Sequence, residues 1–148
     1  MTADLTILYE HPAWFAPLFA ALDRRGVRYE ALHLSDHRFD PSDRTPPSPV
    51  VLSRVAMSSF LREADHGIFY AEALFAHWAA CGARVINGAG VIAIDRSKAR
   101  QMSLIAGLGI GIPRTRVVHR AVDLPAAAAE IGLPIIVKAN IGGSGAGI

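Results

Sequence analysis

Short apolar runs alternate with longer helical patterns along the first part of the sequence. Runs typical of strands in a parallel sheet occur at 5–9, 28–32, 49–52 and 84–87. Apolar residues recur at helical spacing over 13–25 and 70–81, and a glycine follows each pattern as a stop signal. Strands that alternate with helices form parallel sheets, because each helix crosses back between two strands. The pattern predicts an open, mainly parallel, doubly wound α/β sheet.

In the second part of the chain, the expected helices and strands follow a different order. A short helix is expected over 91–94 and a longer one from about Ser97 to Leu108, with Asp95 and Ser97 as N-cap candidates. Strands are expected over 115–118 and 135–137, on either side of an alanine-rich helix over 124–131. The change predicts one α/β domain over 1–94 and the start of an α+β unit over 95–148.

Composition narrows the classes of protein that the sequence can represent. Hydrophobic residues make up 51% of the chain and charged residues 19%, which predicts an ordered structure. The net charge is only +2 and the basic residues form no run, which argues against a nucleic-acid-binding protein. A single cysteine, Cys81, and the lack of an apolar stretch near 18 residues predict a cytoplasmic protein without a membrane segment.

The clearest chemical signal is a glycine-rich segment after the last expected strand. It consists of Gly142, Gly143, Ser144, Gly145, Ala146 and Gly147. Glycine-rich loops after strands bind phosphates, because backbone N–H groups can approach the anion without interference from Cβ atoms. The sequence therefore directs attention to nucleotide binding.

Three classes of phosphate-binding loop compete for this segment. A Walker-type loop would have a lysine where Ile148 stands, and a dinucleotide fold would have G-x-G-x-x-G opening a helix. The third class is a hairpin loop that folds over a triphosphate, with a lysine on the preceding strand. Lys138 lies four residues before Gly142 and directly follows an apolar run, so the third class fits best.

Four motifs follow one another over 95–148: Ser97-Lys98 at a helix start, the run G-I-G-I-P-R-T from Gly109, the run I-I-V-K ending at Lys138, and the glycine-rich segment. Their order and spacing resemble the start of the domain that defines the ATP-grasp superfamily, most closely its RimK-like branch of peptide and amino-acid ligases. Residues 1–94 resemble the domain that precedes ATP-grasp domains, here called the pre-ATP-grasp domain, in layout only.

The resemblance implies an ATP-dependent ligase that uses ATP and Mg²⁺. ATP phosphates would be bound by Lys98, Lys138 and the glycine-rich segment. A substrate carboxylate would attack the γ-phosphate to give an acyl phosphate, and an amine would capture it to form an amide or peptide bond. The expected substrates are a small carboxylate and an amine, amino acid or peptide.

The resemblance also implies what this sequence lacks. The family's Mg²⁺ ligands and catalytic arginine would lie beyond Ile148, so the chain is expected to be an N-terminal fragment, truncated at the glycine-rich segment and inactive alone. No catalytic residue and no metal ligand is assigned. His33 and His37 have the spacing of a metal pair on a helix, but the polar, proline-containing run around them predicts a loop instead.

Two further residues are weak candidates for substrate binding. His11 follows the first expected strand and Arg54 the third, and parallel sheets bind ligands at the carboxyl ends of strands. The run from His11 to Phe15 could instead be a hydrophobic staple at a helix start.

The main alternative function is a non-catalytic α/β module that binds a ligand or mediates dimerisation. An exposed strand edge at 135–148 would permit association, so a homodimer is also an expectation.

Overall fold

A computed structural model describes residues 3–61 and 67–142 of the chain. The chain divides into two compact units, Met1–Ala93 and Ile94–Ile148, and each is described here by itself. In the described residues, no helix combines the length and the apolar character that crossing a bilayer requires.

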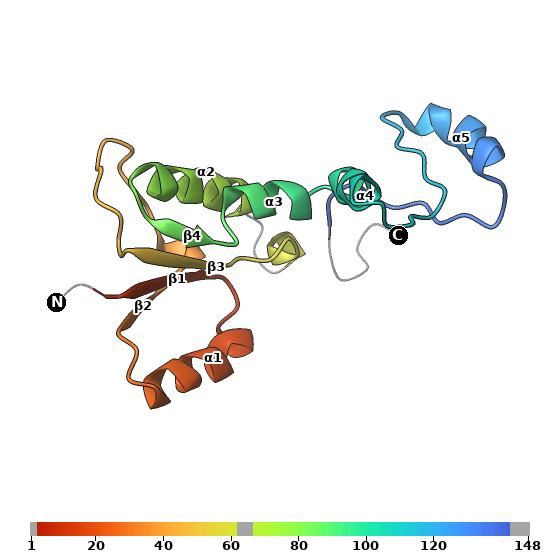
Figure 1. The fold of residues 1–148 in the computed structure, drawn as a ribbon. Helices are drawn as coiled ribbons and strands as arrows, with labels where there is room; N and C mark the ends of the chain where they lie inside the picture. Colours follow the sequence, from red (N-terminus) through yellow and green to blue (C-terminus); the bar gives the residue numbers. More distant parts are fainter. Residues whose placement is uncertain (1–2, 62–66, 143–148) are drawn as a thin grey trace. The chain divides into compact units, whose positions relative to one another are not determined.

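The first unit is built on a four-stranded sheet with the order β2-β1-β3-β4 (Figure 1). The strands are β1 (Leu5–Tyr9), β2 (Tyr29–His33), β3 (Val50–Arg54) and β4 (Arg84–Ile86). All three neighbouring pairs are parallel. The predicted α/β fold class is confirmed, and every expected strand of this part of the chain is present within two residues of its expected bounds.

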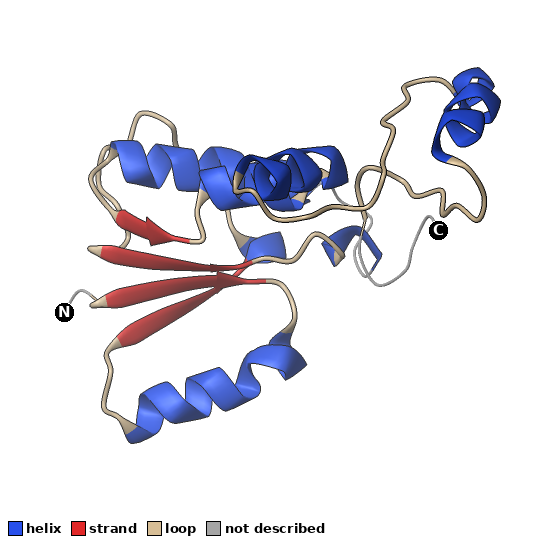
Figure 2. Cartoon of the chain, turned by 45° about the vertical axis from the view of Figure 1, so that its right-hand side comes forward, coloured by secondary structure: helices blue, strands red, loops and turns tan. Residues whose placement is uncertain are grey.

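Helices cover both faces of this sheet. Helix α1 (Pro12–Arg24) lies on one face and α2 (Gly67–Ala80) on the other (Figure 2). His11 caps α1, and the helix begins with Pro12. Proline suits the first turn because it lacks an N–H, and an N–H at that position would have no partner within the helix. Gly26 and Gly82 follow the two helices with φ of +62° and +96°, a backbone conformation that favours glycine. The sheet is therefore doubly wound, as predicted.

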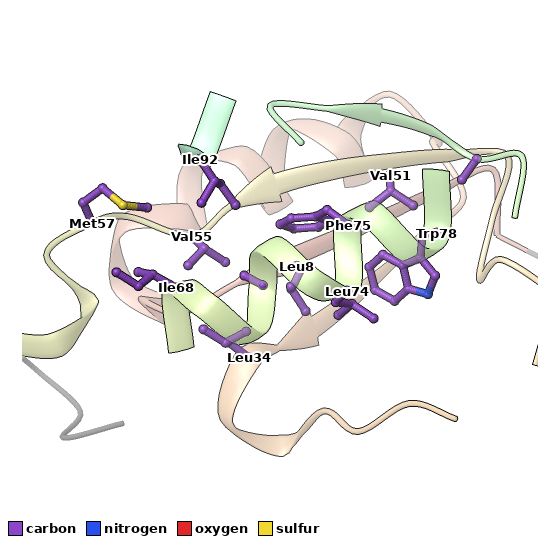
Figure 3. Packing of buried hydrophobic residues seen from close by; sticks show 12 residues of the cluster. Leu8, Leu34, Val51, Val55, Met57, Ile68, Leu74, Phe75, Trp78 and Ile92 are labelled. Atoms are coloured by element: carbon purple, nitrogen blue, oxygen red, sulfur yellow. The ribbon is translucent and has the colours of Figure 1, made fainter. Parts of the chain in front are cut away.

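The core of the first unit lies between α2 and the sheet. The buried residues of α2 are Ile68, Ala71, Leu74, Phe75 and Trp78. They pack against buried strand residues that include Leu8 and Val51 (Figure 3). Leu74 and Phe75 are fully buried, which makes this helix face the largest apolar contribution to the core.

Shorter elements complete the path of the chain. They are the 3₁₀ helices η1 (Leu34–Asp36), η2 (Ser59–Leu61) and η3 (Ala121–Asp123), and the helix α3 (Ala89–Asp95). Asp95 is the last residue of α3, so its prediction as a helix N-cap is wrong. Ser97 is the N-cap of the next helix, α4 (Lys98–Gly107), and its side chain accepts a hydrogen bond from the Arg100 N–H, as the prediction required.

The second unit contains α4 and α5 (Leu124–Ile131), and no strand is assigned in its described part, 94–142. The prediction of strands over 115–118 and 135–137, which both lie in this described part, is therefore wrong. Ile136 is 72% exposed and Val137 is 52% exposed, although both were expected in a buried strand. A strand requires a hydrogen-bonded neighbour, and no described residue of this unit pairs with either run.

The packing of α2 predicts a large effect of truncation at its centre. Phe75→Ala should lower the free energy of unfolding of the first unit by about 3–5 kcal/mol, because a fully buried ring is replaced by a cavity. Urea unfolding followed by tryptophan fluorescence measures this change. The matched control is Leu61→Ala, which removes a side chain that is 50% exposed and should cost less than about 1 kcal/mol. Equal effects of the two substitutions would contradict this account of the core.

Candidate functional site

Two of the residues predicted to bind ATP phosphates lie together in the second unit. Lys98 is the first residue of α4, and Gly142 is the buried first residue of the glycine-rich segment. The Lys98 Nζ atom donates a hydrogen bond to the Gly142 carbonyl oxygen at 3.1 Å. The Lys98 cation thus lies at the start of this segment, although Lys98 and Gly142 are 44 positions apart in sequence. Residues Gly143, Ser144, Gly145, Ala146 and Gly147 were also predicted to bind phosphates, and they lie outside the described residues.

Lys138 lies on the same stretch of chain, four residues before Gly142. Its side chain is exposed to solvent. It and Lys98 are the only two lysines in the sequence, and both fall within the motifs that resemble the ATP-grasp pattern. The Lys138 ammonium is therefore accessible to a ligand, but its described surroundings do not identify that ligand.

Asn140 is a residue of this region that the sequence analysis missed. Its main-chain and side-chain oxygens both accept hydrogen bonds from the first turn of α4. No spacing rule in the sequence indicates this contact, because its partners are more than 40 residues away. An asparagine next to a glycine-rich segment is the only local signal, and by itself it indicates a turn.

The weak candidates His11 and Arg54 both lie at the carboxyl edge of the first unit's sheet. Arg54 ends β3 and pairs in register with Tyr9, the last residue of β1. The Arg54 guanidinium lies 4.8 Å from the centre of the buried Phe15 ring, a cation–π contact that holds an exposed charge at this edge. His11 caps α1 through its Nδ1 atom, which accepts from the Trp14 N–H at 3.3 Å. The ring of His11 stacks on that of Trp14, so part of its role is structural.

Buried polar residues also follow the ends of β1 and β3. Glu10 is 4% exposed, and Ser58 and Ser59 are 7% and 6% exposed. Burial of a polar group is costly unless the group is hydrogen-bonded. The sequence favours a helix cap over a nucleophile for Ser58 and Ser59, because no His or Asp partner is placed near them by spacing. It gives Glu10 no metal role, because the acidic residues of the chain are scattered.

A second group of polar side chains lines a cavity of about 320 Å³ beside β1 and β2. His33 and His37 both line it, together with Tyr9 and Asp36. The two imidazoles have separate partners. His33 Nε2 lies 3.3 Å from the Glu10 carbonyl oxygen, and His37 Nδ1 lies 2.8 Å from the Tyr70 hydroxyl. In residues 3–61 and 67–142, no three His, Cys, Asp or Glu side chains are grouped as a metal site.

Comparisons of the sequence find similar proteins. No protein-family model matches the chain. The protein named "Probable alpha-L-glutamate ligase 2" of Shewanella frigidimarina is 33% identical over 81 residues, which cover 54% of this chain and 27% of that protein. The protein of the same name from Shewanella sp. MR-4 is 25% identical over 123 residues, covering 82% of this chain and 36% of that protein.

Comparisons of the fold agree with those of the sequence. The RimK domain ATP-grasp protein of Sphaerobacter thermophilus matches with a TM-score of 0.69 and 21% identity, over 97% of this chain and 51% of the other. The ATP-grasp ligase PsnB, solved with its precursor peptide and AMPPNP, matches with a TM-score of 0.58 and 13% identity, over 87% of this chain and 52% of the other.

The resemblance to the RimK-like ATP-grasp family is thereby confirmed. The chain spans 27% to 36% of the length of the curated relatives and about half of the solved RimK-like chain. At 21% and 13% identity the solved structures demonstrate the shared fold.

The environment of His37 predicts that the chain becomes less stable in mild acid. Partial burial lowers the pKa of His37 below its ordinary value of about 6.5, and the charge of Glu30 opposes this only in part. The neutral imidazole is therefore favoured in the folded state. Its contribution to stability is complete above about pH 6.5 and is lost as the pH falls from there through the lowered pKa.

Two substitutions test this pH dependence by urea unfolding at pH 7.5 and pH 5.5. His37→Asn removes the titrating ring and retains an amide that can bond to Tyr70, so the loss of stability between the two pH values should shrink. Tyr70→Phe removes the hydrogen bond but not the imidazole, so the loss between the two pH values should remain. A pH dependence that His37→Asn does not change would show that another group causes it.

Proposed function

We propose that this chain contributes the pre-ATP-grasp domain and the first ATP-binding elements of an ATP-dependent carboxylate–amine ligase. Its curated relatives are named as glutamate ligases, and its structural relatives as ATP-grasp proteins. The proposal assigns residues 1–94 to the pre-ATP-grasp domain and 95–148 to the ATP-grasp domain. A non-catalytic ligand-binding or dimerisation module is the alternative that the experiments below distinguish.

The observation that carries the proposal is the contact between Lys98 and Gly142. The Lys98 ammonium lies 3.1 Å from the Gly142 carbonyl oxygen and so provides a positive charge at the start of the glycine-rich segment. Phosphate groups require that combination of a cation and closely approaching N–H donors. We infer that a triphosphate would bind here, with Lys98 and Lys138 as its cationic ligands. The backbone of the segment from Gly142 to Gly147 would supply the N–H donors.

The reaction proposed for the complete ligase proceeds in two transfers. A carboxylate oxygen of the substrate forms a bond to the γ-phosphorus as the bond to ADP breaks, which gives an acyl phosphate. The amine nitrogen then bonds to the acyl carbon, phosphate leaves, and the nitrogen loses a proton. Both steps depend mainly on charge neutralisation and positioning, which lysines can supply and which Mg²⁺ would reinforce when bound with the nucleotide.

The carboxyl edge of the first unit's sheet is the proposed region for substrate contacts. Arg54 is an exposed cation held against the Phe15 ring, and a guanidinium binds carboxylates in a bidentate manner. His11 lies at the end of the adjacent strand β1. We assign these two residues to the carboxylate-bearing substrate, which in this family is a small acid, an amino acid or a peptide.

The proposal predicts that both lysines contribute to nucleotide binding. Lys98→Met and Lys138→Met should each weaken the binding of AMPPNP with Mg²⁺ by about tenfold or more, because each removes a charged hydrogen bond to phosphate. Isothermal titration calorimetry on the full chain measures the affinity. The matched control is Arg120→Met, which removes a cation of the same unit from an exposed ion pair with Asp123 and should leave the affinity unchanged.

The presence of only two lysines allows an independent test without substitutions. AMPPNP should slow the reductive methylation of Lys98 and Lys138, which mass spectrometry detects separately from the N-terminal amine. If the wild-type chain binds no analogue and neither lysine is protected, the non-catalytic module is the better description. If the analogue binds to Lys98→Met and Lys138→Met as tightly as to the wild-type chain, these lysines are not its ligands.

A further inference from the structure

Asn140 joins two parts of the second unit that are distant in sequence. Its main-chain oxygen accepts a hydrogen bond from the Lys98 N–H at 2.9 Å. Its side-chain Oδ1 accepts from the Ala99 N–H at 2.9 Å and from the Ser97 hydroxyl at 3.2 Å. The atom that faces Ala99 must be the oxygen of the amide, because a backbone N–H can only donate.

These contacts occupy the N-terminal end of α4. The first N–H groups of an α-helix have no partner within the helix. In α4, Asn140 accepts from Lys98 and Ala99, while the Ser97 hydroxyl and main-chain oxygen accept from Arg100 and Gln101. The first-turn amides are therefore satisfied within the chain. Positive charge near Gly142 comes from the Lys98 side chain and not from free amides of α4.

The position of Asn140 links the helix to the glycine-rich segment. Asn140 stands two residues before Gly142, and its three hydrogen bonds fix that stretch of backbone against residues 97–99. Lys98 belongs to the same turn and reaches the Gly142 carbonyl with its Nζ atom. Displacement of Asn140 would therefore move the start of the glycine-rich segment away from the cation.

We propose that Asn140 is a positioning residue that holds the start of the glycine-rich segment on the N-terminus of α4 and so sets the place of the Lys98 ammonium. Its consequence for nucleotide affinity rests on the function proposed above. Its structural part, the attachment of the segment to α4, can be measured without any nucleotide.

Amide hydrogen exchange on the full chain tests the attachment. In Asn140→Ala, the Ala99 amide loses its acceptor, and its exchange should become about tenfold faster. The Lys98 amide should also exchange faster, because it bonds to the main chain of residue 140 and reports whether the segment stays in place. Asn140→Asp retains an acceptor oxygen and should restore the protection of both amides. The control, Gln101→Ala, removes a hydrogen bond that a side chain of α4 donates to the Asp95 carbonyl oxygen, and it should leave both amides protected.

Calorimetry with AMPPNP and Mg²⁺ on the same variants tests the effect of Asn140 on nucleotide affinity. Asn140→Ala should weaken binding about fivefold, and Gln101→Ala should not weaken it. Unchanged amide protection in Asn140→Ala would overturn the proposal. Lost protection with unchanged affinity would overturn the role of Asn140 in placing Lys98 for a nucleotide. If the wild-type chain binds no AMPPNP, the proposed function fails, while amide exchange still decides whether Asn140 holds the segment.

Discussion

Burial of the central strand β1 on both faces is the constraint on which the first unit depends. Ile7 and Leu8 point to opposite faces of the sheet and are both fully buried, so each face needs a covering helix. Helix α1 follows β1 and leads to β2 on one side, whereas α2 follows β3 and leads to β4 on the other. The direction in which successive strands are added to the sheet therefore reverses beside β1. In open parallel sheets such a reversal is where ligands commonly bind, at the carboxyl ends of the strands. Arg54 ends β3 and His11 follows β1 at this edge.

The second unit is organised on a different physical basis. Neither α4 nor α5 has a buried residue, so apolar burial does not explain how its described segments are held. Hydrogen bonds between segments replace it. Asn140 attaches one segment to α4, and Arg114 attaches another to the carbonyl of Glu130 near the end of α5. Attachments of this kind depend on single polar side chains, in contrast to the many contacts that fix α2.

The sequence predicted the first unit more completely than the second, for physical reasons. Helical and strand periodicities report burial on one or two faces, and residues such as Ile7 and Phe75 are buried as their patterns require. Ile136 and Val137 have the composition of a strand, but composition cannot supply a neighbouring strand. The resemblance to ATP-grasp proteins selected Lys98 and Gly142, whereas the contacts of Asn140 link residues too far apart for any spacing rule.

The two edges of the first unit's sheet bear on how copies of the protein behave at high concentration. Unpaired edge strands can recruit a strand from another molecule and so begin aggregation. The edge at β4 consists of only three residues, Arg84–Ile86, which is too short to form an extended ladder. The other edge is β2, and the charged side chain of Glu30, near the start of this strand, is exposed. Both edges therefore resist strand exchange between molecules, which favours solubility of this unit during folding and in a crowded solution.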